Sequence, residues 1–260
     1  MSNKIYIPLI SPIKENGEVC SESVHALMEL SREYTAGYIP CLTSGEGWLL
    51  SDAQWQDMVR ACVGNAGNKK IIAGIEKATT QEVVAFAKLA ESLGAEGVMV
   101  TTPFGEHVSQ KEMLAHFHKV HDAIGIEVFI YNENSLSKNV VTSELLMEIS
   151  CLPRVVGVKE SMDNDVNPNV LKQLKTNGVT IYQGWENRIV NDELSEGNIC
   201  SLSNLYPEVC SLAAQTNNAE LEATVDKLCT DHRIFEEDWY RHIKAYLFSN
   251  GVISTDYVLS

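Results

Sequence analysis

Eight short apolar runs recur along this chain, and nearly every one is followed by a segment with helical periodicity. Runs of this length, bounded by polar or glycine-containing turns, predict β-strands. Several of the intervening segments open with a capping box, which marks a helix start: Ser51 with Gln54, Thr79 with Glu82, and Ser109 with Glu112. The predicted strands are Ile5–Ile10, Gly37–Leu42, Lys70–Ile75, Gly97–Thr102, Glu127–Asn132, Val155–Glu160, Thr180–Gly184 and Asn198–Ser203.

Eight strand–helix units in a chain of 260 residues predict an α/β protein with a closed (β/α)8 barrel, the TIM-barrel fold. An open doubly wound sheet is the competing architecture, but it usually has fewer strands and a glycine-rich first turn. The sequence contains neither G-x-G-x-x-G nor a P-loop. The barrel is therefore the favoured architecture.

The pattern after Ser203 is helical only, with predicted helices at Pro207–Thr216, Ala219–Leu228 and Phe235–Phe248. No linker or change of composition separates these helices from the preceding units. We therefore expect residues 1–205 to form the barrel and residues 206–260 to form an additional C-terminal helical extension packed on it.

The charge of the chain limits its partners. The 260 residues carry a net charge of −15 and give a pI near 4.9, which argues against nucleic acid or an anionic membrane surface as a partner. Seven cysteines are dispersed without CxxC or metal-ligand spacing, a pattern typical of reduced intracellular thiols. There is no signal-peptide-like apolar region and no run of membrane-spanning length. We expect a cytoplasmic protein.

Lys159 and Tyr131 end neighbouring predicted strands, and barrel enzymes place their chemistry at the carboxyl ends of the strands. Desolvation lowers the pKa of an amine, and a neutral amine can attack a ketone to form a Schiff base. Neighbouring strands lie about 4.8 Å apart, so a phenol at the matching position can exchange protons with a lysine adduct. Taken singly, each residue is more often structural. Together they predict a catalytic pair.

Side chains alternate between the two faces of a strand, which identifies the other residues expected at this end of the barrel. Gly157 shares the face of Lys159 and leaves room below it. Thr43 and its neighbour Ser44 follow the second strand, while Ser201 and Ser203 belong to the eighth. The predicted site therefore combines an amine, a phenol and several hydroxyl groups.

These residues lie in stretches that resemble the dihydrodipicolinate synthase/N-acetylneuraminate lyase family. The stretches follow the order and spacing of that family from near Pro8 to the C-terminal helices, and the ordered set is more specific than any single motif. They are Thr43-Ser44-Gly45-Glu46, Thr102-Pro103-Phe104, Tyr131-Asn132, Gly157-Val158-Lys159-Glu160-Ser161, Gln183-Gly184-Trp185-Glu186 and Gly197-Asn198-Ile199-Cys200-Ser201.

The resemblance implies a class I mechanism in which Lys159 forms a Schiff base with pyruvate or a pyruvate-derived 2-oxo acid, without a metal or organic cofactor. Tyr131 would shuttle protons at the adduct, and Thr43 would orient Tyr131 in a hydroxyl relay. Ser44, with the backbone N–H groups of Ser44 and Gly45, would hold the carboxylate and fix the plane of the adduct. The resemblance also implies a homodimer or homotetramer.

The sequence departs from the family in two loops. Family members commonly have two tyrosines after Thr-Pro, the second being a relay residue supplied across a subunit interface, whereas this chain has Phe104 and Gly105. Glu106 or His107 is a candidate replacement, although loop residues of this kind are more often merely exposed. Leu136 stands where synthase members carry an arginine that grips the second substrate's carboxylate. These departures argue against dihydrodipicolinate synthase itself.

The region of Gly184 and Glu186, with Ser161 and Ser201, is more like the sugar-binding part of the lyase branch, where acidic and hydroxyl side chains bind a polyhydroxylated tail. Glu186 is equally well explained as an acid favoured by a helix N-terminus. The leading hypothesis is reversible addition of a 2-oxo acid to an aldehyde, with a sugar-like aldehyde as a candidate. Two alternatives stay open: dehydration, hydration or decarboxylation through the same imine, and a non-catalytic ligand-binding or assembly protein.

Three histidines, His116, His118 and His121, lie close together in the sequence. On a helix, residues two positions apart point away from each other, and no carboxylate or cysteine completes a ligand set. We interpret them as surface histidines and predict no metal site.

Overall fold

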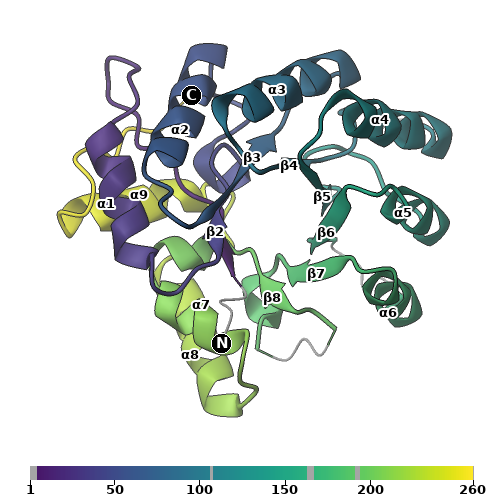
Figure 1. Cartoon of the computed structure of the whole chain (residues 1–260). Helices are drawn as coiled ribbons and strands as arrows, with labels where there is room; N and C mark the ends of the chain where they lie inside the picture. The colour runs from purple at the N-terminus through teal and green to yellow at the C-terminus, as the bar shows by residue number, and fades with distance from the viewer. Residues whose placement is uncertain (1–4, 106–107, 163–166, 191–193, 260) are drawn as a thin grey trace.

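The computed structural model describes residues 5–105, 108–162, 167–190 and 194–259. Its strands form one sheet of eight parallel strands that follow the order of the chain. A bridge between Ile5 and Asn198 joins the first and last strands, so the sheet closes into the predicted (β/α)8 barrel, surrounded by helices (Figure 1). The strands are β1 (Tyr6–Ile7), β2 (Gly37–Tyr38), β3 (Lys70–Ile75), β4 (Gly97–Val100), β5 (Glu127–Asn132), β6 (Val155–Glu160), β7 (Thr180–Gln183) and β8 (Gly197–Asn198).

The helices alternate with the strands as predicted, and all three predicted capping boxes are formed. The α-helices are α1 (Ser21–Ser31), α2 (Asp52–Gly64), α3 (Thr80–Leu93), α4 (Gln110–Ala123), α5 (Ser143–Ser150), α6 (Pro168–Thr176), α7 (Pro207–Ala213), α8 (Ala219–Asp231) and α9 (Trp239–Ser249). Three short 3-10 helices follow strand ends: η1 (Thr43–Gly45), η2 (Glu186–Arg188) and η3 (Ser201–Asn204).

Several predicted boundaries are wrong, and local backbone chemistry explains them. β1 and β2 are short because Pro8 and Pro40 follow them and lack the N–H that a ladder needs. Cys41, at a positive φ of 62°, then turns the chain into η1. The eighth strand ends at Asn198, so Ser201 and Ser203 lie on η3 rather than on a strand. α9 begins at Trp239 instead of Phe235, after a turn in which Arg233 has a φ of 54°.

The barrel interior is filled by apolar and aromatic side chains. Tyr6, Phe129 and Tyr182 pack edge-on or tilted against one another, with ring centroids 5.6–6.4 Å apart. Gly157 makes room for this packing, because a Cβ there would lie 2.5 Å from the Phe129 ring. A larger cluster of buried side chains lies between the sheet and the helices. The interior cluster includes Tyr131 and fills the barrel below the carboxyl ends of the strands.

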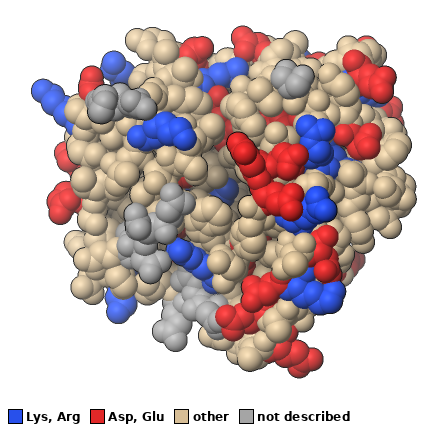
Figure 2. Space-filling view, turned by 180° about the vertical axis from the view of Figure 1, so that it is seen from behind, with Lys and Arg blue, Asp and Glu red and all other residues tan. Residues whose placement is uncertain are grey.

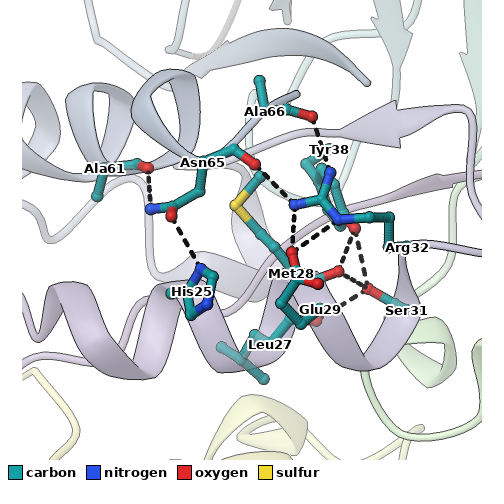
Figure 3. A network of polar contacts seen from close by, with 10 residues as sticks. All are labelled: His25, Leu27, Met28, Glu29, Ser31, Arg32, Tyr38, Ala61, Asn65 and Ala66. Carbon is teal, nitrogen blue, oxygen red and sulfur yellow. Dashed lines mark hydrogen bonds and ion pairs between the residues drawn. The ribbon is translucent and has the colours of Figure 1, made fainter. Parts of the chain in front are cut away.

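A polar network joins α1 to the end of α2 (Figure 3). The Arg32 guanidinium donates to the backbone oxygens of Asn65, at 2.8 Å, and Ala66, at 3.0 Å. Asn65 also pairs with His25 through its side chain at 2.9 Å. A cation at the last carbonyl groups of a helix satisfies acceptors that have no partner within the helix. This network therefore fixes α2 against α1 on the outside of the barrel.

The C-terminal helices pack on the loops that follow the strands: α7 on η3, α8 on η2 and α9 on η1. Lys244 of α9 forms a fully buried ion pair with Glu46, whose other carboxylate oxygen accepts the Leu259 N–H at 2.8 Å. Removing one partner of a buried pair is strongly destabilising, so this contact anchors the C-terminal segment beside η1. The division into residues 1–205 and 206–260 stays a prediction.

Two of the three histidines are not surface residues. His116 and His121 are buried, because they lie on the side of α4 that packs inward, whereas His118 is exposed. Burial lowers the pKa of His116 to about 4, and its Nδ1 shares a hydrogen bond with the Thr80 hydroxyl at 3.0 Å. These side chains are packing residues.

In the described ranges, no helix is long and apolar enough to cross a bilayer.

Candidate active site

Lys159 and Tyr131 lie side by side at the carboxyl ends of β6 and β5. They are register partners in the parallel ladder, and both are buried, with exposed fractions of 5% and 9%. The Lys159 Nζ lies 4.0 Å from the centre of the Tyr131 ring, in the range of a cation–π contact. Within the described part of the chain, the Lys159 amine forms no ion pair or hydrogen bond. Its amine is therefore buried but uncommitted.

A cavity of about 450 Å³ opens above these two residues. Figure 2 shows this face of the molecule, opposite to that of Figure 1, hollowed near its centre with acidic side chains along one side. The predicted site residues that line the cavity are Thr43, Ser44, Tyr131, Lys159, Ser161, Gly184, Glu186 and Ser201. Loops following β2, β5, β6, β7 and β8 thus converge on one space large enough for a small substrate.

Gly45, a predicted substrate-binding residue, does not line the cavity. Its N–H closes the turn of η1 by donating to the Leu42 oxygen at 2.7 Å, so it is not available to a carboxylate. A Cβ at this position would lie 2.6 Å from the Leu9 oxygen, which explains the glycine as a requirement of close backbone approach. The N–H group of Ser44 precedes this bond and has no acceptor within the turn.

Two serine hydroxyls meet at one side of the cavity. The Ser44 Oγ lies 2.7 Å from the Ser201 Oγ, which brings η1 and η3 together. Ser203, which was expected in the site, instead donates to the Cys200 oxygen at 2.6 Å and is fully buried. Its hydroxyl stabilises η3 and does not line the cavity.

Glu186 lines the cavity at the start of η2, but its carboxylate is engaged by backbone groups. Oε1 accepts the N–H of Ser201 at 2.6 Å and of Leu202 at 3.3 Å. These are the first N–H groups of η3, so the acid caps the start of this neighbouring helix. Burial raises the pKa of Glu186. Its visible role is to fix the segment that carries Ser201.

Ser161 carries an uncommitted hydroxyl inside the cavity. Its Oγ is buried and has no hydrogen-bond partner among the described residues, a costly arrangement unless a ligand supplies the partner. Gly184 makes this position possible, because a Cβ there would lie 1.8 Å from the Ser161 Oγ and 2.7 Å from the Glu160 oxygen. The pair therefore presents a hydroxyl to whatever occupies the cavity.

Gly184→Ala should lower stability by about 1–3 kcal/mol, because the added methyl overpacks a fixed backbone contact and displaces Ser161. Thermal melting measures the loss. Gly64→Ala is the matched control, since a Cβ at that position meets nothing within 4 Å, and its melting temperature should stay the same or rise slightly. Equal melting temperatures for the Gly184 variant and the wild type would contradict the contact.

Two acids at this end of the barrel carry no recognisable motif in the sequence. Glu76 directly follows β3, is 3% exposed, and accepts a hydrogen bond from the Thr43 Oγ1 at 2.5 Å. Glu133 directly follows β5, lines the cavity, and accepts the N–H groups of Leu136 and Ser137 at 2.7 and 3.1 Å. The one available signal was position, since an acid directly after a barrel strand lies at the functional face.

The outer part of the cavity is formed by residues far apart in the sequence. Leu136 and Trp185 come from the loops after β5 and β7. The turn between α8 and α9 contributes Ile234, Phe235, Glu236 and Glu237, and α9 contributes its first residue, Trp239. Lys159 is the one cationic side chain among the described residues that line the cavity. The outer wall is therefore apolar and acidic.

The candidate replacements for the missing second tyrosine, Glu106 and His107, lie outside the described residues. Gly105, at a φ of 125°, donates its N–H to the Ser137 oxygen at 3.2 Å.

Thr43 contacts Tyr131, with its Oγ1 at 3.4 Å from the phenol oxygen. The chain of hydroxyl groups from Tyr131 through Thr43 therefore leads to Glu76.

Comparison with known proteins points to one family. The model of the dihydrodipicolinate synthetase family matches residues 1–260. The 4-hydroxy-tetrahydrodipicolinate synthase of Caldicellulosiruptor bescii is 31% identical over 222 residues, covering 83% of this chain and 75% of the relative. The enzyme of that name from Clostridium novyi is 28% identical over 242 residues, covering 89% and 81%.

Solved structures share the fold. Dihydrodipicolinate synthase from Bacteroides thetaiotaomicron superposes with a TM-score of 0.90 at 21% identity, over 100% of this chain and 92% of that one. YagE, a prophage protein of the dihydrodipicolinic acid synthase family from E. coli K12 solved in complex with pyruvate, gives 0.87 at 18% identity, over 99% and 91%. Both therefore have the barrel architecture of this chain.

Proposed function

Because the chain belongs to the dihydrodipicolinate synthetase family, whose members are Schiff-base lyases acting on pyruvate, we propose that it joins a 2-oxo acid reversibly to an aldehyde through an imine on Lys159. The observation that carries this proposal is the buried amine of Lys159 beside the Tyr131 phenol in one cavity. A nucleophile next to a proton-transfer group is what imine chemistry requires.

The cavity residues take distinct roles in the proposed reaction. The Lys159 amine attacks the carbonyl carbon of pyruvate, and the protonated imine then withdraws electrons from the adjacent carbon, which supports carbon–carbon bond formation or cleavage. Tyr131 moves protons to and from the adduct. The hydroxyl and N–H of Ser44 hold the carboxylate, and the Ser201 hydroxyl, 2.7 Å from that of Ser44, supports them.

The second substrate is proposed to be an aldehyde without a carboxylate. With Lys159 committed to the imine, no other cation lines the described part of the cavity, while Glu236 and Glu237 face it. A second carboxylate would be repelled there, because like charges that are placed side by side disfavour binding. The uncommitted Ser161 hydroxyl supports an acceptor that carries a hydroxyl group. Glu186 contributes by holding η3 in place. This chain is thus proposed to differ in substrate from the synthases that it resembles.

The acceptor proposal predicts a clear preference. Neutral hydroxylated aldehydes should give a kcat/KM at least about 10-fold higher than aldehydes of the same length that end in a carboxylate. Leu136→Arg adds a cation at the cavity wall and should reduce this ratio, whereas Leu30→Arg, an exposed position on α1, should leave it unchanged. Pyruvate-dependent consumption of each aldehyde is the measurement. A carboxylate-bearing aldehyde as the best substrate of the wild type would refute the proposal.

A further inference from the structure

Glu76 is a buried acid at the catalytic end of the barrel, yet it does not line the cavity. Its Oε1 accepts the Thr43 hydroxyl at 2.5 Å, while Oε2 is buried and has no hydrogen-bond partner among the described residues. A buried carboxyl group that is only half satisfied is costly to keep. A purely structural acceptor for Thr43 would not need an ionisable group.

Charged and titratable groups surround Glu76 on several elements. Burial raises the pKa of its carboxyl, the Thr43 hydrogen bond and Lys159 oppose the increase, and the charge of Glu133 adds to it, so that the resulting pKa is about 8. Burial raises the pKa of the Cys41 thiol, which follows β2, and the charge of Glu76 adds to this increase. The amine of the adjacent Lys77 forms an ion pair with Asp52 at 3.2 Å and lies over the Phe86 ring, so it does not neutralise Glu76. The carboxyl therefore changes protonation near neutral pH, which suits a proton-transfer group.

The hydroxyl of Thr43 connects this acid to the site. Thr43 Oγ1 lies 2.5 Å from Glu76 and 3.4 Å from the Tyr131 phenol. A hydroxyl has one proton to donate and can accept at the same time. The three groups therefore form a chain that can be oriented in either direction, from Glu76 toward Tyr131 or from Tyr131 toward Glu76.

We propose that Glu76 is the proton reservoir of this relay, acting on the reaction through Thr43 and Tyr131. The inference rests on the imine mechanism proposed above. When the carbinolamine on Lys159 loses water, the Glu76 proton moves to Thr43, the Thr43 proton to Tyr131, and the Tyr131 proton to the departing hydroxyl. The C–O bond breaks, the nitrogen lone pair forms the C=N bond, and Glu76 is left as a carboxylate.

The charges balance in this step. One proton leaves Glu76 and one water molecule forms, so the new positive charge on the imine is matched by a new negative charge on the carboxylate. The charge of Lys159 lowers the pKa of Glu76 and so favours its carboxylate form. Opposite charges that form together in a buried site stabilise each other. The reverse hops return the proton to Glu76 when water attacks the imine to release product.

The test is the pH dependence of single-turnover imine formation with pyruvate, quenched by borohydride and quantified by intact mass. In the wild type the rate should fall as pH rises through about 8, the pKa of the Glu76 carboxyl, because the proton donor is then lost. Glu76→Gln can still accept the Thr43 hydrogen bond but has no proton to give. We expect its rate to be lower by about 10- to 10²-fold and to lack this alkaline inflection.

Variants of Thr43 provide the matched pair. Thr43→Val breaks the chain and should reproduce the Glu76→Gln profile, whereas Thr43→Ser keeps the hydroxyl and should retain the wild-type inflection. A Glu76→Gln protein with the wild-type rate and inflection would overturn the inference while leaving the imine mechanism intact. A wild type that forms no adduct with pyruvate or larger 2-oxo acids would overturn the proposed function, and this inference with it.

Thermal melting checks the protonation of Glu76 without any substrate. The pKa of this carboxyl is raised in the folded protein from an ordinary value of 4.5 to about 8. Its stabilising contribution is therefore complete below pH 4.5 and is lost as pH rises through about 8. Glu76→Gln should remove this part of the pH dependence of the melting temperature. An unchanged pH dependence would contradict a buried, protonated Glu76.

Discussion

Replacing Lys159 with alanine is expected to abolish both the borohydride-trapped pyruvate adduct and turnover. The adduct requires the amine itself, and no other cationic side chain lines the described part of the cavity. Removal of a covalent nucleophile costs on the order of 10⁴-fold or more in kcat, because the remaining groups cannot replace the covalent intermediate. Intact-mass analysis after incubation with pyruvate and borohydride measures the adduct, and aldehyde consumption measures turnover.

The fold of this variant should be preserved. The amine of the buried Lys159 forms no ion pair or hydrogen bond with the described residues, so removing it also removes an unpaired polar group. We expect a melting temperature equal to or above that of the wild type. Lys172→Ala, which removes an exposed lysine of α6, is the control and should keep both adduct and activity. An adduct that persists in the Lys159 variant would show that another amine is the nucleophile.

The pairing of Lys159 with Tyr131 could be predicted because it depends on local geometry. Parallel strands bring their carboxyl ends to the same edge, and both residues are second to last in strands whose bounds agree with the prediction. The same reasoning placed Thr43 and Ser44 after β2. The strand lengths near the N-terminus were wrong because Pro8 and Pro40 interrupt the hydrogen-bond ladder, a chemical effect that the apolar pattern alone does not show.

Other parts of the site depend on contacts between distant segments, which periodicity does not encode. Phe235 and Trp239 reach the cavity only because α8 and α9 pack on the loops after β7 and β2. Glu76 follows β3 and contacts Thr43, which follows the neighbouring β2. Its raised pKa comes from burial, which the sequence does not show. Gly45 was assigned to substrate binding, but its N–H closes a turn. Assembly into a homodimer or homotetramer stays a prediction.

The second large effect is expected for Tyr131→Phe, which should reduce kcat by about 10²–10⁴-fold while the imine still forms. Phenylalanine keeps the ring that lies 4.0 Å from the Lys159 Nζ and removes only the hydroxyl. Proton transfer to and from the adduct then loses its donor and acceptor, whereas the nucleophile remains. The hydrogen bond to Thr43 is long, at 3.4 Å, so the stability lost should stay below about 1 kcal/mol.

Tyr182 provides a matched control for this prediction. It is the register partner of Lys159 on the other side, in β7, and its phenol is buried in the barrel interior without lining the cavity. Tyr182→Phe should therefore leave kcat within a few-fold of the wild type. A trapped adduct with slow turnover in the Tyr131 variant alone assigns proton transfer to the β5 phenol. Equal turnover of the Tyr131 variant and the wild type would refute that role, and with it the path from the adduct to Glu76.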